Sequence, residues 1–310
     1  MSKLITSIQE SWHEFAVKAS WPTMSELQKS TALVIVGTII FSLVVFGMDK
    51  IISTCYFSAV KVLSYIHHLW YYLVAFVTIL ALLPVLLWTA RPGGNYHHFF
   101  KVAKVWSWMY LVGMGVWPRP GKYQIKHDGP VVLSPNHGSD LDIPLTFLAS
   151  PTPVVFMGKA ELLKLPLFGY FFKQTSIAVD RSSFSGRKQA MIDADQKIKE
   201  GFSVCIFPEG GIPPQKYLMR GFKAGAFKLA VENNVPVVLL SIYQSKFRLG
   251  DWGEPSSIGP VDTKVLGEFW VDPKEANPVQ ELMDRSYRVL ATDLKNWGHT
   301  GEVALPLEEN

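Results

Sequence analysis

Two long runs without a charged residue constrain this chain more than any other feature of its sequence. The first covers residues 31–48 and the second residues 69–90. Each is about as long as the roughly 20 residues that a helix needs to cross the hydrocarbon core of a bilayer. The second run carries Trp and Tyr residues near its ends, as segments at membrane interfaces do. We therefore predict a transmembrane hairpin of two helices.

The basic residues around these runs predict an orientation. Three lysines precede the first run, and the segment between the runs, residues 49–68, contains two. The flank after the second run contains five basic residues, Arg91, Lys101, Lys104, Arg119 and Lys122. Because positive residues favour the cytoplasmic side of a membrane, both ends of the hairpin are expected there.

Two neighbouring segments are predicted to lie on the membrane surface. Residues 3–20 place Ile8, Trp12 and Phe15 on one face of an amphipathic helix, and residues 99–117 are rich in tryptophan and aliphatic residues. The whole chain is 48% hydrophobic and only 18% charged, which favours a membrane protein. Residues 1–121 are therefore predicted as an N-terminal membrane region, followed by a domain over residues 122–310.

The pattern changes after residue 121, where short apolar runs alternate with helical periodicity. Strands are predicted over residues 131–134, 153–158, 176–180, 203–207 and 236–243. Helices are predicted over residues 141–149, 160–173, 186–200, 222–233 and 278–297, with a loose tail from residue 298. Such alternation predicts an α/β fold with a largely parallel sheet flanked by helices.

The turn after the first predicted strand contains several side chains that can take part in catalysis. It contains His137 and two carboxylates, Asp140 and Asp142, and a second polar turn with Glu209 follows another apolar run. A histidine can accept a proton near neutral pH, and a carboxylate on its other ring nitrogen holds the tautomer. The spacing alone does not decide between the two aspartates. Polar turns at strand ends are where open α/β sheets place their active sites.

Several other classes of function lack support in the sequence. The cysteines, Cys55 and Cys205, form neither a disulfide framework nor a zinc pattern, and the histidine pairs at 67–68 and 97–98 lack partners at ligand spacing, so no metal is expected. The net charge of +4 is spread along segments predicted to face the membrane, so nucleic-acid binding is not expected.

A serine-type lipid hydrolase is an alternative from another class. Ser134 and Ser139 flank His137 and could in principle supply a nucleophile. The sequence has no Gly-x-Ser-x-Gly elbow, which disfavours this alternative.

Residues 125–245 resemble the membrane glycerolipid acyltransferases, specifically the bacterial 1-acylglycerol-3-phosphate acyltransferases. Four blocks carry the resemblance in order: Asn136-His137-x4-Asp142, Ile177-Ala178-Val179-Asp180-Arg181, Phe207-Pro208-Glu209-Gly210 and Val235-Pro236-Val237-Val238. Two linking pieces also agree: Lys159-x-Glu161-Leu162-x3-Pro166-x2-Gly169 and Phe222-Lys223-x-Gly225-Ala226-Phe227-x2-Ala230.

The resemblance implies acyl transfer from a thioester, acyl-CoA or acyl carrier protein, to the free hydroxyl of 1-acyl-glycerol-3-phosphate. The product would be phosphatidic acid, made without a cofactor by an integral protein of the bacterial inner (cytoplasmic) membrane whose catalytic domain is on the cytoplasmic side. Its other partners would be membrane lipids and the lysophospholipid acceptor.

The resemblance also implies roles for individual residues. His137 would be the general base, Asp142 its support, Glu209 a residue that orders the acceptor site, and Lys159 a stabiliser of the oxyanion. Arg181 would bind phosphate, because guanidinium pairs with it in a bidentate way. The remaining residues expected to bind substrate are Asn136, Gly210, Gly211, Arg220 and Lys223.

One departure from the family pattern concerns the acceptor. The family usually continues Pro-Glu-Gly with Thr-Arg, whereas this chain has Gly211, Ile212 and Pro213. Arg220 could replace the missing arginine from a neighbouring turn. A lyso-aminolipid acceptor, of the ornithine or glycine type, is therefore an alternative to a phosphate-bearing one.

Overall fold

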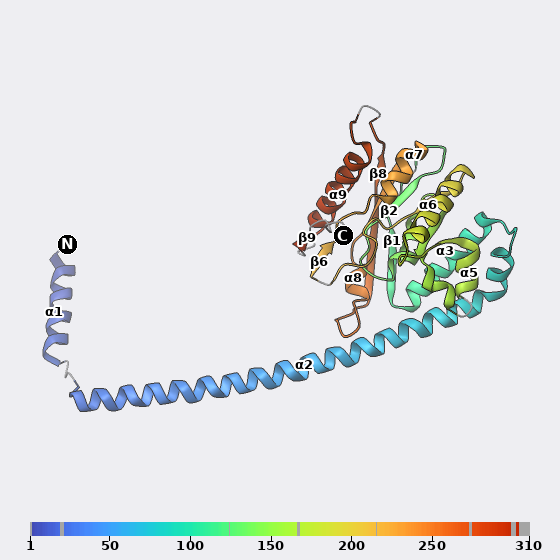
Figure 1. The fold of residues 1–310 in the computed structure, drawn as a ribbon. Coiled ribbons are helices and arrows are strands. Elements are labelled where there is room, and N and C mark those ends of the chain that lie inside the picture. The colour runs from blue at the N-terminus through green and yellow to red at the C-terminus, as the bar shows by residue number, and fades with distance from the viewer. Residues whose placement is uncertain are drawn as a thin grey trace. The chain divides into compact units, whose positions relative to one another are not determined.

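The computed structural model describes residues 2–18, 22–123, 125–165, 168–214, 216–272, 275–298 and 302–303. The chain forms two compact units, Met1–Ala59 and Val60–Asn310. The first contains helix α1 (Ser2–Lys18) and the beginning of helix α2 (Met24–Thr89). The second contains the rest of α2 and the sheets (Figure 1).

Helix α1 agrees with the helix predicted over residues 3–20 as far as residue 18, and residues 19–21 lie outside the described residues. Ile8, Trp12 and Phe15 are all more than half exposed. Their spacing of four and three residues puts them on one face of the helix. The contact of this face with a membrane surface stays a prediction.

Helix α2 differs from the predicted transmembrane hairpin, because it is one continuous helix of 66 residues. Residues 49–68, predicted as the connection, are helical. The physical reason is that no glycine or proline occurs between residues 48 and 83, so nothing in this stretch breaks a helix. A capping box begins α2, since Glu26 N–H donates to Thr23 Oγ1 and Thr23 N–H donates to the Glu26 carboxylate.

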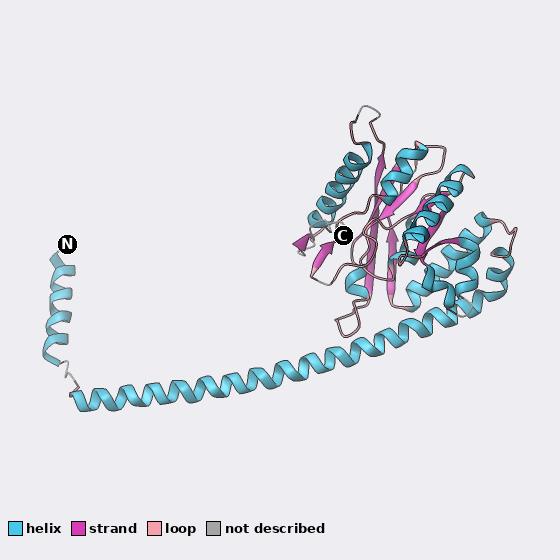
Figure 2. Ribbon diagram, in the orientation of Figure 1, coloured by secondary structure: helices cyan, strands magenta, loops and turns pink. Residues whose placement is uncertain are grey.

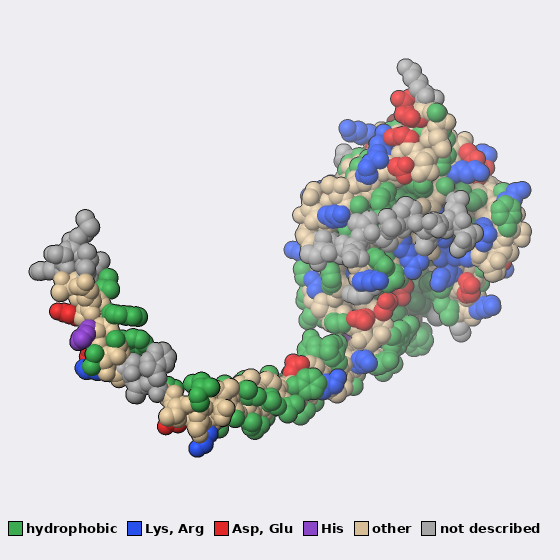
Figure 3. Space-filling view, turned by 60° about the vertical axis from the view of Figure 1, so that its left-hand side comes forward, with side chains coloured by type: hydrophobic (Ala, Val, Ile, Leu, Met, Phe, Trp, Pro, Cys, Tyr) green, Lys and Arg blue, Asp and Glu red, His purple; other side chains and the backbone are tan. Residues whose placement is uncertain are grey.

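Among the described residues, α2 alone is long and apolar enough to cross a membrane, judged by length and composition. Hydrophobic side chains predominate along it in Figure 3. This apolar surface supports association of the protein with a membrane.

Helix α3 (Tyr96–Gly113) is more buried than the interfacial helix predicted over residues 99–117. Phe100 and Leu111 lie in the core, while Trp108 is 56% exposed. Strand β1 (Val116–Pro120) follows and pairs with strand β8 (Gly259–Phe269). Because α3 and β1 pack with the sheet, they belong to the second unit, which differs from the predicted boundary at residue 121.

The second unit is built around a seven-stranded sheet with the order β1-β8-β7-β2-β5-β3-β4. Figure 2 shows the strands in magenta with helices packed around them. Its neighbouring strands are parallel except β7 and β8, which are antiparallel. The further strands of this sheet are β2 (Val132–Pro135), β3 (Val154–Lys159), β4 (Ser176–Val179), β5 (Ser203–Cys205) and β7 (Val237–Ile242). Strands β6 (Tyr217–Met219) and β9 (Glu302–Val303) pair separately.

Helices cover both faces of this sheet. Successive strand residues point to opposite faces, so Leu133 joins one hydrophobic core and Val132 the other. The first core includes residues of α3 and of α4 (Asp142–Ala149), and the second includes residues of α6 (Phe184–Lys199), α7 (Gly225–Asn233) and α9 (Pro278–Asn296). The predicted α/β class with a largely parallel sheet flanked by helices is confirmed.

The five predicted strands begin and end within two residues of β2, β3, β4, β5 and β7. The helix predicted over residues 160–173 is instead a 3₁₀ helix, η1 (Ala160–Lys164), followed by α5 (Phe168–Thr175). The sequence has a proline between them, and a proline has no N–H for a continuous helix. A short helix, α8 (Ser245–Arg248), follows β7. Most of the predicted tail lies outside the described residues.

Candidate active site

The chemically active side chains gather at one edge of the sheet. Strands β2, β5, β3, β4 and β7 are parallel and therefore all end at this edge. His137 follows β2, Glu209 follows β5, Lys159 is the last residue of β3, and Arg181 comes shortly after β4. The sheet topology thus brings together residues that are up to 72 positions apart in the chain.

His137 and Asp142 form a hydrogen-bonded pair. The ring atom Nδ1 of His137 lies 2.9 Å from Oδ2 of Asp142, a fully buried carboxylate in the first turn of α4. The same oxygen accepts the backbone N–H groups of Gly138 and Ser139. Because an ionised carboxylate only accepts, Nδ1 must carry the proton, and Nε2 of the neutral ring is left with its lone pair.

This geometry separates the two aspartates that the sequence left open. Asp142 holds the His137 ring, whereas Asp140 is exposed and forms no hydrogen bond with that ring. The side chain of His137 keeps 15% of its surface exposed, and its ring stacks on Phe207 with centroids 4.3 Å apart. The ring is therefore held on two sides while part of the side chain stays exposed.

Glu209 ties two turns of the site together from a fully buried position. Its Oε1 accepts the backbone N–H of His137 at 2.8 Å, and its Oε2 accepts that of Arg220 at 2.7 Å. Burial raises the pKa of Glu209 to about 8, although both hydrogen bonds act in the opposite direction. Glu209 therefore positions backbone and does not reach the surface of the site.

Asn136 has a similar structural task at the end of β2. Its side-chain amide donates to the carbonyl of Ile242 at 2.9 Å, and its side-chain oxygen accepts the N–H of Ile242 at 2.7 Å. These two bonds join the ends of β2 and β7 just before His137. The structure therefore gives Asn136 a role in holding the turn.

Three cationic side chains surround the turn at Gly210 and Gly211. The guanidinium of Arg181 donates to the Gly210 carbonyl at 2.6 Å. A Cβ on Gly210 would lie 2.9 Å from Cε of Lys223, and one on Gly211 would lie 3.6 Å from Nη1 of Arg220. Gly210 also has φ of +69°, which favours glycine. The turn is thus a compact, positively charged surface, although the family's arginine is missing from it.

Lys159 is the fourth predicted site residue at this edge of the sheet. It is exposed at the end of β3. Within the described residues it forms no hydrogen bond or ion pair with His137, Asp142 or Glu209. Its predicted part in catalysis stays a prediction.

Lys246, in α8, is a buried residue near the site that was not predicted from the sequence. Its side chain is only 8% exposed, and its ammonium donates to the carbonyls of Pro214 (3.0 Å) and Tyr217 (2.5 Å). Burial lowers the pKa of Lys246. Lys246 holds the segment that leads from the Gly210 turn to β6. The sequence feature that could have indicated this role is the position of the lysine, four residues after a fully buried strand.

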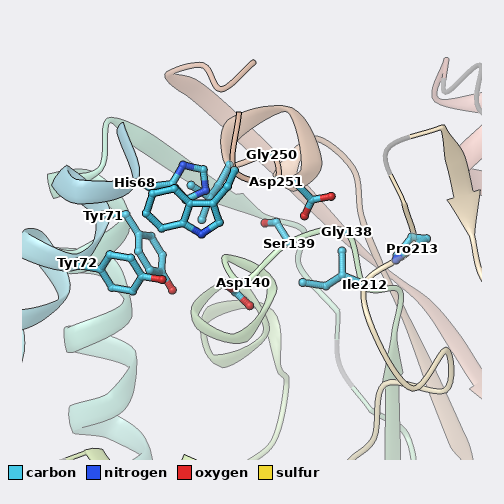
Figure 4. A pocket seen from close by; sticks show the side chains of 12 residues that line it. His68, Tyr71, Tyr72, Gly138, Ser139, Asp140, Ile212, Pro213, Gly250 and Asp251 are labelled. Atoms are coloured by element: carbon cyan, nitrogen blue, oxygen red, sulfur yellow. The ribbon is translucent and has the colours of Figure 1, made fainter. Parts of the chain in front are cut away.

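A small cleft of about 70 Å³ lies beside the His137 turn. Figure 4 shows His68, Tyr71 and Tyr72 on one side of it and Ile212 and Pro213 on the other. The side chains of α2 in this wall were predicted only as a membrane-interface belt. Among the described residues no group of three or more histidine, cysteine or acidic side chains is arranged to hold a metal ion.

Comparison with known proteins gives two family matches. A sequence model of the acyltransferase family matches residues 120–243, and a model of the SecE/Sec61-gamma subunits of protein translocation complex matches residues 5–60. The first match covers the sheet edge with His137, Lys159, Arg181 and Glu209. The second coincides closely with the first compact unit.

Individual relatives agree with the acyltransferase match. A Caenorhabditis elegans protein with the provisional name of a 1-acyl-sn-glycerol-3-phosphate acyltransferase is 30% identical over 206 residues, which cover 64% of this chain and 75% of the relative. The human 1-acyl-sn-glycerol-3-phosphate acyltransferase beta is 28% identical, over 60% of this chain and 67% of its own length.

A solved structure supports the fold. The crystal structure of the 1-acyl-sn-glycerophosphate (LPA) acyltransferase PlsC from Thermotoga maritima superposes with a TM-score of 0.62, covering 76% of this chain and 97% of that one at 24% sequence identity. The solved structure supports the fold of the sheet and its helices, and the sequence relatives show the family. The chain belongs to the acyltransferase family that includes the 1-acyl-sn-glycerol-3-phosphate acyltransferases.

Proposed function

We propose that this protein transfers an acyl group from a thioester to the free hydroxyl of 1-acyl-glycerol-3-phosphate and so forms phosphatidic acid. The observation that carries the proposal is the His137–Asp142 pair, with Nε2 of His137 available, beside the cationic turn at Gly210. The activity named for the relatives supports the same acceptor.

The geometry supports a direct transfer. Nε2 of His137 takes the proton of the acceptor hydroxyl as its oxygen attacks the thioester carbonyl, and the carboxylate of Asp142 stabilises the imidazolium. The tetrahedral intermediate then collapses, the carbon–sulfur bond breaks, and the thiolate takes the proton from Nε2. The product is an ester and a free thiol, and no acyl-enzyme forms.

The oxyanion of the intermediate needs a donor. The N–H groups of Gly138 and Ser139 are occupied by Asp142, so they cannot serve. The ammonium of Lys159, at the end of β3, is our candidate, because an exposed lysine side chain is long and adjustable.

The acceptor phosphate is proposed to bind at the cationic turn. Arg181, Arg220 and Lys223 supply charge there, and the backbone of Gly210 and Gly211 permits close approach. This arrangement replaces the arginine that the turn lacks.

The acyl donor is proposed to be acyl-CoA or an acyl carrier protein, used as a co-substrate without a further cofactor. We also propose that the catalytic unit acts at the inner membrane of a bacterium, on its cytoplasmic side, because basic residues concentrate after residue 90. Since α2 is continuous, a single crossing would place its N-terminal end on the opposite side, so the two ends need not share a side.

Replacement of His137 tests the proposal. His137→Ala should lower the rate of lysophosphatidic acid acylation by about 10²–10⁴-fold while the protein stays folded, because the general base is lost. His127→Ala is the matched control, since His127 lies upstream of β2 and meets the Trp270 ring edge to face. Near-normal turnover of the His137 variant would refute the mechanism.

A second variant separates transferase from hydrolase. Ser139 is 3% exposed, and its Oγ accepts the N–H of Leu141, which suits a structural hydroxyl. Ser139→Ala should therefore keep most of the transfer activity. Loss of activity together with a trapped acyl-serine in the parent protein would favour the hydrolase alternative.

A further inference from the structure

The cleft beside the His137 turn has walls that the proposed acyl transfer does not use. They come from α2, from the turn after β2, from residues 212–213 and from residues 249–252. The α2 residues involved, His68, Tyr71 and Tyr72, and the other lining segments all belong to the second compact unit. The cleft is therefore part of the folded catalytic unit and needs its own explanation.

Aromatic rings form one wall of the cleft. Trp252 stacks on His68 with centroids 4.2 Å apart and lies 6.2 Å from Tyr72. Tyr71 and Tyr72 meet edge to face at 4.9 Å. Trp252 remains 52% exposed, so part of its ring is available to a ligand. The π faces of such rings attract cations.

The charged groups that line the cleft are carboxylates, alongside hydroxyl groups that can both donate and accept. Asp140 and Asp251 are exposed carboxylates in its lining, and within the described residues neither forms an ion pair. Among the described residues that line the cleft there is no lysine or arginine, and the lysines that act on its carboxylates from outside it are Lys159 on Asp140 and Lys246 on Asp251. The cleft therefore disfavours an anion and favours a positively charged group.

His68 adds a hydrogen-bond acceptor on a largely buried side chain. It is only 5% exposed, and its Nδ1 lies 2.8 Å from the carbonyl oxygen of Ser64. A carbonyl only accepts, so Nδ1 donates, and Nε2 of the neutral ring is an acceptor. Among the described residues Nε2 has no hydrogen-bond partner. Nε2 of His68 is not one of the buried unpaired atoms, so it keeps some exposure, and an accessible acceptor on a residue that lines the cleft is a place where a ligand's N–H can bind.

We propose that this cleft binds an alkylammonium group carried by the phosphate of the acceptor, so that the protein also acylates lysophospholipids with an ethanolamine-type head group. The inference rests on the proposed function. Aromatic faces, two carboxylates and the Nε2 of His68 together match an ammonium.

The position of the cleft explains why the ammonium would be joined to a phosphate. Ile212 lines the cleft and directly follows Gly211 of the cationic turn. A phosphate held by Arg181, Arg220 and Lys223 would thus lie next to the acceptors of the cleft. Opposite charges in the protein then match the two charges of a zwitterionic head group.

The test compares four acceptors with the purified full-length protein and one acyl-CoA. Lysophosphatidylethanolamine has the phosphate and the ammonium, lysophosphatidylglycerol has a phosphate with a neutral substituent, lysophosphatidic acid has the phosphate alone, and a lyso-ornithine lipid has the ammonium without phosphate. We expect kcat/KM for lysophosphatidylethanolamine to exceed that for lysophosphatidylglycerol about 10-fold. Equal values for these two would overturn the inference, and a preference for the ornithine lipid would overturn its phosphate part.

Variants locate the effect. Asp251→Asn should lower the ratio of the two kcat/KM values about 10-fold, because a carboxylate beside the ammonium loses its charge. The matched control is Glu254→Gln, an exposed carboxylate of the same loop that does not line the cleft, and it should leave the ratio unchanged. Trp252→Phe should keep the ratio better than Trp252→Ala. An equal fall in both rates for Asp251→Asn, or an equal effect of Glu254→Gln, would overturn the assignment.

A binding measurement keeps the inference separate from the proposed function. Glycerophosphoethanolamine should change the tryptophan fluorescence of the protein more than glycerophosphoglycerol does, and Trp252→Phe should abolish the difference. This readout does not need catalysis. Acylation of lysophosphatidic acid without any preference in binding would leave the function standing and refute the ammonium site. Preferential binding without acylation of any lysolipid would do the reverse.

Discussion

Asp142→Asn tests the central pair of the site with the smallest change of shape. Oδ2 of Asp142 accepts three N–H groups, from the His137 ring and from the backbone of Gly138 and Ser139. The other oxygen, Oδ1, is buried and has no hydrogen-bond partner. An asparagine must therefore place its NH₂ group either against three donors or in a buried position without an acceptor.

The second orientation costs less free energy, so we use it to work out the expected changes in stability and in kcat. The asparagine oxygen keeps the three hydrogen bonds, but a buried NH₂ group without a partner costs about 1–3 kcal/mol of stability. The imidazolium that forms during transfer loses its negative partner. A carboxylate-to-amide change behind a catalytic histidine typically lowers kcat by about 10⁴-fold in serine proteases. We expect a loss of about 10³–10⁴-fold here.

The assay is steady-state acylation of lysophosphatidic acid by the purified protein in detergent, with Tm measured in parallel. The KM values should change little, because neither substrate touches the buried carboxylate. Asp128→Asn, an exposed aspartate upstream of β2, makes the same chemical change away from the site and should leave kcat intact. A kcat of Asp142→Asn within about threefold of the parent would refute the argument that this carboxylate supports the base.

Three further outcomes follow from the contacts of the site and the fold. Because burial raises the pKa of Glu209 to about 8 from 4.5, the folded chain holds a proton that the unfolded chain releases, so the free energy of unfolding should fall as pH rises from about 5 to about 8. Thermal unfolding of Glu209→Gln across this range should show a flatter curve, and an unchanged slope would contradict it. Arg181→Ala should raise the KM for lysophosphatidic acid about 10-fold or more, with partial rescue by lysine, which lacks the bidentate geometry; an unchanged KM in both Arg181→Ala and Arg220→Ala would exclude phosphate binding at this turn. A chain that begins at Lys122 lacks α3 and β1 and should aggregate or melt well below the parent, as seen by circular dichroism, whereas a stable, soluble product would contradict the packing of α3 in the core.

Much of the second unit could be predicted from local pattern. Five strands were predicted within two residues of their bounds, because each is a short apolar run bounded by turn residues. Strand β1 was missed, since it directly follows a helix rich in tryptophan and its pairing partner, β8, lies more than a hundred residues later. The continuous helix α2 shows another limit of prediction from local pattern. Two apolar runs of membrane length do not by themselves require a turn between them.

The site shows the same division. His137 and Glu209 could be found because both are polar residues at the ends of apolar runs. The choice of Asp142 over Asp140 could not be made from the residues alone, since it depends on how the chain turns into α4. Glu209 was expected to order the acceptor site, but its bonds to the backbone of His137 and Arg220 are visible only in the fold.

By itself the sequence determined the α/β class, the alternation of strands and helices that gives a largely parallel sheet, and the residues that meet at the edge of that sheet. These follow from periodicity and from polar turns after buried strands. Only the tertiary structure decided which cationic side chains surround Gly210, what Lys246 holds and which rings line the cleft. The physical reason is that each of these depends on contacts between segments far apart in the chain, and such contacts are set by the order of strands in the sheet, which no local pattern contains.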